Sequence, residues 1–146
     1  PAVISHGYGQ GFAAEFDWPG TRDPSAWLAV PEALAFHARL GGAELMARNV
    51  AMAASAAAGL AARFGTETGA GNRAAGAMAT VRLTDERPAD RARAEAVRGR
   101  LLEMGTDVPV MVHGDRLWLR LSAQAYNEPG DFERMAGLVE QALAAG

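Results

Sequence analysis

The strongest constraint on the fold is a stretch near the C-terminus that predicts a β-hairpin. Two runs of alternating apolar residues, 108–112 and 117–122, flank Gly114-Asp115. Alternation with period two is typical of half-buried strands, and a two-residue turn with Gly first suits a tight hairpin. With residue 113 facing residue 116, every second pair sets a Val against a Leu, which gives one continuous apolar face: Val112–Leu117, Val110–Leu119 and Val108–Leu121.

The opposite face of this hairpin is mixed, because it carries Trp118 and Arg120. A strand that contains Pro109 lacks one ladder donor and is expected at an edge of its sheet. An arginine on the second face is solvated, stacked on Trp118 or paired with an acid of the last helix, or else it binds a ligand. The pattern by itself leaves these alternatives open.

The segments around the hairpin complete a β-α-β-β-α order. Residues 77–83 alternate as a strand, residues 88–104 have helical periodicity and end at Gly105, and residues 127–145 predict a closing helix with Asn127 as its cap. We therefore predict an α+β fold in which long N-terminal helices precede a three-stranded sheet covered by helices. The same order fits a ferredoxin-like module without its last strand, which would bind a small molecule and catalyse nothing.

The beginning of the chain predicts a short strand, an ordered loop and a helix. Residues 2–5 are apolar enough for a strand, and the loop after them is rich in Gly and aromatic residues. Asp23 suits an N-cap and Pro24 suits the first helical position. Pro31 predicts a break, after which a second helical piece runs to about residue 40.

A long Ala-rich helix is expected over residues 43–64. Its predicted apolar face consists of Met46, Val50, Ala53, Ala57, Leu60 and Phe64. The turn-rich segment 65–76 predicts a mobile loop or linker. The sequence thus divides into an N-terminal part, 1–64, the loop, 65–76, and a small α+β domain, 77–146.

Composition excludes several kinds of chemistry. The chain has no Cys, and all of its basic residues are Arg, so it forms neither a thiolate site nor a lysine Schiff base. The three His do not show a metal-ligand spacing, and a net charge of −3 gives no case for nucleic acid or an acidic membrane. The apolar run 50–62 is too short to span a bilayer, and no targeting segment is visible, so we expect a cytoplasmic protein. The abrupt apolar start suggests a piece of something longer.

Two strings resemble a known family. "FDWPGTRDPSAWLAVPEALAFHARLGG" and "WLRLSAQAYNEPGDFERM" are similar to class V aminotransferases, enzymes of fold type I that use pyridoxal 5'-phosphate (PLP), and the first string is closest to the isopenicillin N epimerase-like subgroup. The resemblance covers residues 5–143, which correspond to the last third of such an enzyme. It implies a parent isomerase, transaminase or lyase that acts at Cα of an amino acid or a peptide.

The resemblance also implies roles for individual residues. Arg120 matches the family's arginine for the substrate carboxylate, and Gly20-Thr21 match the Gly-Thr pair that contacts the PLP phosphate of a neighbouring subunit. Partners would be the large PLP-binding domain of the parent and a second copy in a homodimer. The Schiff-base lysine lies upstream in this family, so the chain alone should bind no PLP covalently and should be inactive. Cysteine desulfurases carry a sulfur-accepting Cys in this region, and its absence here argues against that reaction.

Overall fold

The computed structural model describes residues 6–17, 20–69, 71, 76–83 and 88–145. The chain divides into two compact units, 1–39 and 40–146, which are considered separately. The strand expected over residues 2–5 lies outside the described residues.

The first unit contains three described helices, α1 (Phe12–Asp17), α2 (Ser25–Leu28) and α3 (Val30–Arg39). None of them contains a buried residue. The expected break near Pro31 is present, because α2 ends at Leu28 and α3 starts at Val30. Asp23 is not the N-cap: Pro24 occupies that position, although an Asp23 carboxylate oxygen still accepts from the Ser25 N–H at 2.9 Å.

The second unit is built around an antiparallel sheet of three strands, β1 (Met78–Arg82), β2 (Val110–His113) and β3 (Arg116–Ser122), in the order β1-β3-β2. The predicted hairpin register is confirmed for His113–Arg116, Val112–Leu117 and Val110–Leu119. Gly114 has a φ of 63°. That left-handed conformation suits Gly in the first turn position. The strand that follows Pro109 lies at an edge, as expected.

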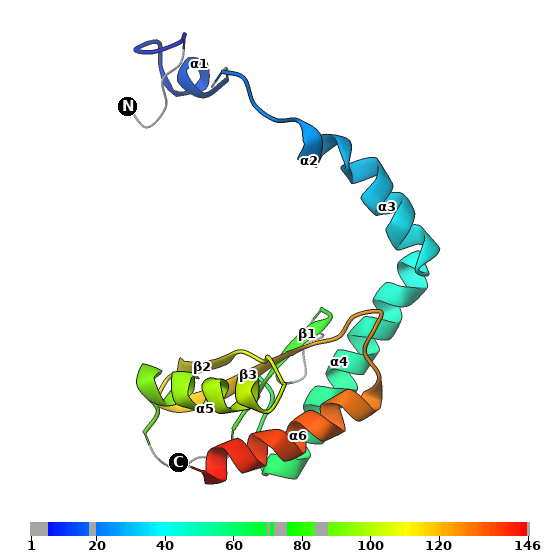
Figure 1. Ribbon diagram of the computed structural model, residues 1–146, viewed down its shortest axis with the longest axis vertical. Coiled ribbons are helices and arrows are strands. Elements are labelled where there is room, and N and C mark those ends of the chain that lie inside the picture. Colours follow the sequence, from blue (N-terminus) through cyan, green and yellow to red (C-terminus); the bar gives the residue numbers. More distant parts are fainter. Residues whose placement is uncertain (1–5, 18–19, 70, 72–75, 84–87, 146) are drawn as a thin grey trace. The chain divides into compact units, whose positions relative to one another are not determined.

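Three helices cover one face of this sheet (Figure 1): α4 (Gly42–Phe64), α5 (Arg91–Glu103) and α6 (Pro129–Ala144). Their apolar faces form one core with Leu117, Leu119 and Leu121 of β3 and with Val81 of β1. Each of these four side chains is at most 1% exposed. The molecule is therefore an α+β fold with a helix-covered sheet of three strands, as the alternation and the helical periodicity predict.

Helix α4 belongs to the sheet-containing unit and not to the N-terminal part with which the sequence grouped it. It contributes Ala53, Ala57, Leu60, Ala61 and Phe64 to that core. Its first turns differ from the prediction, because Leu45 and Asn49 are buried there while Met46 is 58% exposed. By length and composition alone, α4 also meets the criteria for a membrane span. Core helices of soluble proteins meet the same criteria.

The other helices begin slightly later than predicted. Helix α5 follows Asp90, which caps it by accepting from the Arg93 N–H at 2.8 Å. Helix α6 follows Glu128, which forms a capping box with Asp131. Asn127 is therefore not the N-cap of α6.

Candidate functional site

Arg120 lies on the sheet face that no described helix of the second unit covers. It sits near the end of β3, and its direct neighbour on β1 is Thr80. The alternation that buries Leu119 and Leu121 forces Arg120 to the other side, together with Trp118. Its backbone N–H donates to the Pro109 carbonyl at 3.0 Å, so the main chain at this position is held by the sheet.

The Arg120 guanidinium is exposed and available for a ligand. Within the part of the chain that the structure describes, it forms no ion pair with a carboxylate and stacks on no aromatic ring. Stacking on Trp118 and pairing with an acid of the last helix were the structural alternatives for this residue, and neither is observed among these residues. A free guanidinium can hold a carboxylate by two parallel hydrogen bonds.

Residues 66–69 extend the sheet beyond β1, which the sequence did not indicate. They pair along the free edge of β1, where the Gly69 N–H donates to the Thr80 carbonyl at 2.9 Å and the Arg82 N–H donates to the Glu67 carbonyl at 3.0 Å. A Cβ on Gly69 would lie 2.1 Å from the Thr80 hydroxyl oxygen. This part of the predicted mobile loop is thus bonded to the sheet, and only Gly fits at position 69 without a shift.

A polar network holds the chain directly after β3. The buried Asn49 of α4 donates to the Gln124 side-chain oxygen at 3.1 Å. The Gln124 N–H in turn donates to the Asn127 side-chain oxygen at 3.0 Å, and an Arg48 nitrogen donates to the Asn127 carbonyl at 2.8 Å. These bonds tie the segment that follows Arg120 to the first turns of α4. In the sequence, the only indication of this network is that Asn49 interrupts the apolar residues of the helix, and the predicted apolar face does not include it.

Gly20 and Thr21 lie in the first unit, whereas Arg120 lies in the second. Gly20 has a φ of 97°, a left-handed conformation that Gly adopts readily. Thr21 follows it directly and is exposed. A hydroxyl in this position can donate to a phosphate oxygen.

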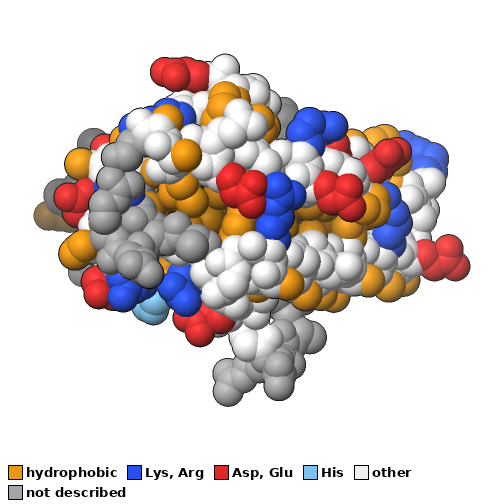
Figure 2. All heavy atoms as spheres, turned by 90° about the horizontal axis from the view of Figure 1, so that it is seen from below, with side chains coloured by type: hydrophobic (Ala, Val, Ile, Leu, Met, Phe, Trp, Pro, Cys, Tyr) orange, Lys and Arg blue, Asp and Glu red, His pale blue; other side chains and the backbone are white. Residues whose placement is uncertain are grey.

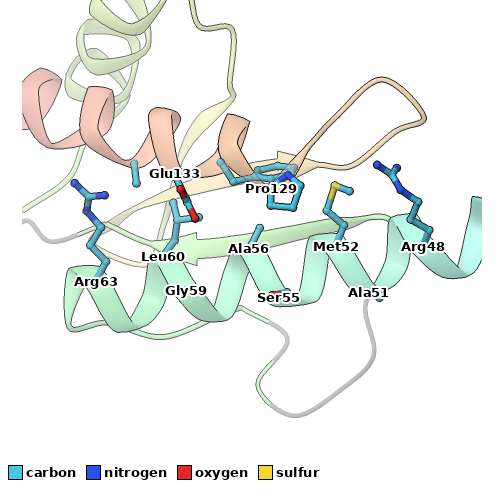
Figure 3. A pocket seen from close by; sticks show the side chains of 12 residues that line it. Arg48, Ala51, Met52, Ser55, Ala56, Gly59, Leu60, Arg63, Pro129 and Glu133 are labelled. Atoms are coloured by element: carbon cyan, nitrogen blue, oxygen red, sulfur yellow. The ribbon is translucent and has the colours of Figure 1, made fainter.

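The second unit also has an elongated groove of about 580 Å³ between α4 and α6 (Figure 3). Small residues of α4, among them Ala51, Ser55 and Gly59, line it from one side, and Pro129 and Phe132 of α6 line it from the other. It carries no metal-binding cluster, and none is formed by the described residues elsewhere.

Comparison with known proteins places this geometry in context. No protein-family model matches the chain. The chain is 30% identical, over an alignment of 166 positions, to the protein named Putative L-cysteine desulfhydrase 1 of Oryza sativa subsp. japonica. The alignment includes 99% of this chain but only 34% of that protein. The chain thus spans about a third of the length of the curated relative it matches.

Solved structures show where this fold occurs. The cysteine desulfurase CsdA of Escherichia coli matches with a TM-score of 0.64 and 20% identity, over 86% of this chain and 32% of that one. A second match is the glutamate decarboxylase domain of a diaminobutyrate-pyruvate transaminase and L-2,4-diaminobutyrate decarboxylase from Vibrio parahaemolyticus. It has a TM-score of 0.63 and 13% identity, over 82% of this chain and 26% of that one. The fold is that of a part of these enzymes.

Proposed function

We propose that this chain is one domain of a PLP-dependent enzyme of the class V aminotransferase kind, and that Arg120 binds the α-carboxylate of its amino-acid substrate. The observation that carries the proposal is an exposed guanidinium that pairs with no described carboxylate, in a chain that aligns over 99% of its length with about a third of the Oryza sativa relative. The parent would work as a homodimer in the cytoplasm.

The residues present fit contacts to PLP but do not fit its covalent capture. The chain has no Lys, so the Schiff-base lysine must come from the rest of the parent. Thr21 offers an exposed hydroxyl and a backbone N–H behind the left-handed Gly20, a donor set that suits a phosphate. When bound, PLP supplies the electron sink for the bond that changes at Cα.

Arg120 contributes orientation. Two parallel hydrogen bonds from the planar guanidinium would fix both the position and the orientation of the substrate carboxylate. The Cα bond to be broken is then held in one orientation relative to the cofactor. The backbone bond to Pro109 and the network around Gln124 keep β3 in place on both sides of this contact. In the parent, Thr21 would serve the phosphate of the neighbouring subunit.

Carbon–sulfur bond cleavage is the reaction that the relative favours. A desulfhydrase releases sulfide and needs no protein thiol to accept the sulfur, which agrees with the absence of Cys in a region where desulfurases carry one. The finer proposal from the sequence, an isopenicillin N epimerase-like isomerase, rests on the "GTRDP" and "LAVPEAL" strings.

The test is a product analysis with the full-length parent. Incubated with L-cysteine, the parent should release sulfide and pyruvate in equal amounts, and the products should disappear when PLP is removed. Inversion at Cα without sulfide would favour the epimerase instead. The chain by itself, incubated with PLP and dialysed, should retain no PLP absorbance beyond what its α-amino group explains. A parent that binds no PLP would refute the proposal.

A further inference from the structure

Helix α4 is apolar on more than its buried face. Ala53 and Ala57 are buried in the core, but Ala51, Ser55 and Gly59 are exposed and small. A helix that is apolar all round is normally covered on all sides. The sheet and α6 cover only part of α4, and the groove between α4 and α6 follows its small, exposed residues.

The shape and lining of this groove suit a helix. In Figure 3, Met52, Ala56 and Leu60 point from α4 towards α6, and Arg48 and Arg63 mark its two ends. At 1.5 Å per residue, the distance from Arg48 to Arg63 along α4 is about 22 Å, or about four helical turns. Small side chains on the floor allow another helix to approach closely, provided that it brings bulky apolar residues.

Charges at the groove specify the occupant further. Arg48 donates to amide and backbone oxygens, yet it pairs with no carboxylate among the described residues, and Glu133 on the α6 side pairs with no described cation. Arg63, by contrast, is already held by two bonds of 2.7 Å to Glu140. In Figure 2, hydrophobic side chains are exposed between Arg, Asp and Glu side chains on the underside of the molecule. An occupant with an acid near Arg48 and a base near Glu133 would complement both of these charges.

From these observations we infer that the α4–α6 groove docks an amphipathic helix from the part of the parent protein that this chain does not include. The inference rests on the proposed function, and the curated relative has about two thirds of its length outside the matched region. A second copy suits the groove less well. In a two-fold contact, the small residues of one groove would face those of the other and leave a gap that protein interiors do not tolerate.

The experiment uses the full-length parent with a single reporter cysteine. Ser55→Cys places it in the groove, and Ala54→Cys places it on an exposed position of the same helix that does not line the groove. A thiol-directed photo-crosslinker is attached and activated, and peptides are identified by mass spectrometry. Ser55→Cys should crosslink within one molecule to a helical peptide outside residues 1–146, and Ala54→Cys should not. In the native protein, Ser55→Cys should also be alkylated at least about tenfold more slowly than Ala54→Cys, because docking covers it.

Each other outcome overturns the inference. Crosslinks to residues 1–146 of a second molecule would assign the groove to self-association. Protection that appears only when lipid vesicles are added would assign it to a membrane. Equal alkylation rates with no crosslink would show an open groove. The product analysis with L-cysteine is independent of these results, so an active enzyme with an open groove refutes docking alone, and a covered groove in a protein that binds no PLP refutes the proposed function alone.

Discussion

Replacement of Arg120 by Ala separates a role in binding from a role in folding. The side chain is exposed and forms no ion pair with the described residues, while its backbone bond to Pro109 does not depend on the side chain. We therefore expect the free energy of unfolding to change by no more than about 0.5 kcal/mol, as for ordinary surface substitutions. Loss of a charge-assisted bidentate contact to the substrate should cost about 2–4 kcal/mol in kcat/KM. That loss corresponds to a decrease of roughly 30- to 900-fold.

The assay compares kcat/KM of the parent for L-cysteine with that for L-cysteine amide, which lacks the carboxylate. Arg120→Ala should lower the first value strongly and the second value little, and Arg120→Lys should recover only part of the loss, because an ammonium does not form the same two parallel bonds. Arg91→Ala is the matched control. It removes the same charge from an exposed position on α5, where Arg91 pairs only with Glu95 among the described residues. A collapse of the thermal midpoint with unchanged kcat/KM of the remaining folded enzyme would show that Arg120 is structural.

Three further predictions concern the cofactor contact, the segment paired with β1 and the cap of α6. Thr21→Ala should weaken the binding of PLP to the parent by no more than about 1.5–3 kcal/mol. A mixed dimer of this variant with a subunit that lacks the Schiff-base lysine should bind PLP normally at its lysine-bearing site. Weakened binding at that site would show that Thr21 serves the site of its own subunit. Gly69→Ala should lower the free energy of unfolding by about 1–3 kcal/mol through its contact with the Thr80 hydroxyl, and Thr80→Ala in the same chain should restore most of it in urea unfolding. Bonds from the Glu128 N–H, from the Asn127 side chain and from Arg134 hold the pKa of Asp131 below its ordinary value. Its contribution to stability is therefore present at neutral pH and is lost as the pH falls through the lowered pKa; Asp131→Ala should flatten this acid loss, and an unchanged acid limb would contradict the assignment.

The elements of the second unit were predictable because each one has a strong local signal. Val and Leu alternate on both sides of Gly114, which determines the hairpin register without help from the rest of the chain. Ala94, Val97 and Leu101 repeat with the helical period and are all buried. The ends of helices were less predictable, because neighbouring residues compete for the cap. Glu128 takes the N-cap position of α6, since its side chain and that of Asp131 satisfy each other's backbone N–H.

Long-range polar contacts account for the remaining differences from the prediction. Met46 is the more apolar residue and was assigned to the buried face of α4, but Asn49 is buried because Gln124, distant in sequence, accepts its amide hydrogen. Helical periodicity contains no information about such a partner. Likewise, the Gly-rich composition after residue 64 predicts mobility, and only the three-dimensional structure shows that residues 66–69 pair with the free edge of β1.

The uncovered face of the sheet and the groove beside α4 call for different explanations. An antiparallel sheet with one face in water is common, so the openness of that face is no evidence of a partner. What distinguishes it is Arg120, a cation that no described residue neutralises, in a position where the main chain is held on both sides. The groove differs from that face, because its floor consists of small, mostly apolar side chains. Covering this apolar surface and removing it from water is favourable. A single charge on a polar face suits a small anionic ligand, whereas an apolar trough of several turns suits a protein segment. The two surfaces therefore lead to separate predictions, one about the substrate and one about the rest of the parent protein, and an experiment can refute either prediction without affecting the other.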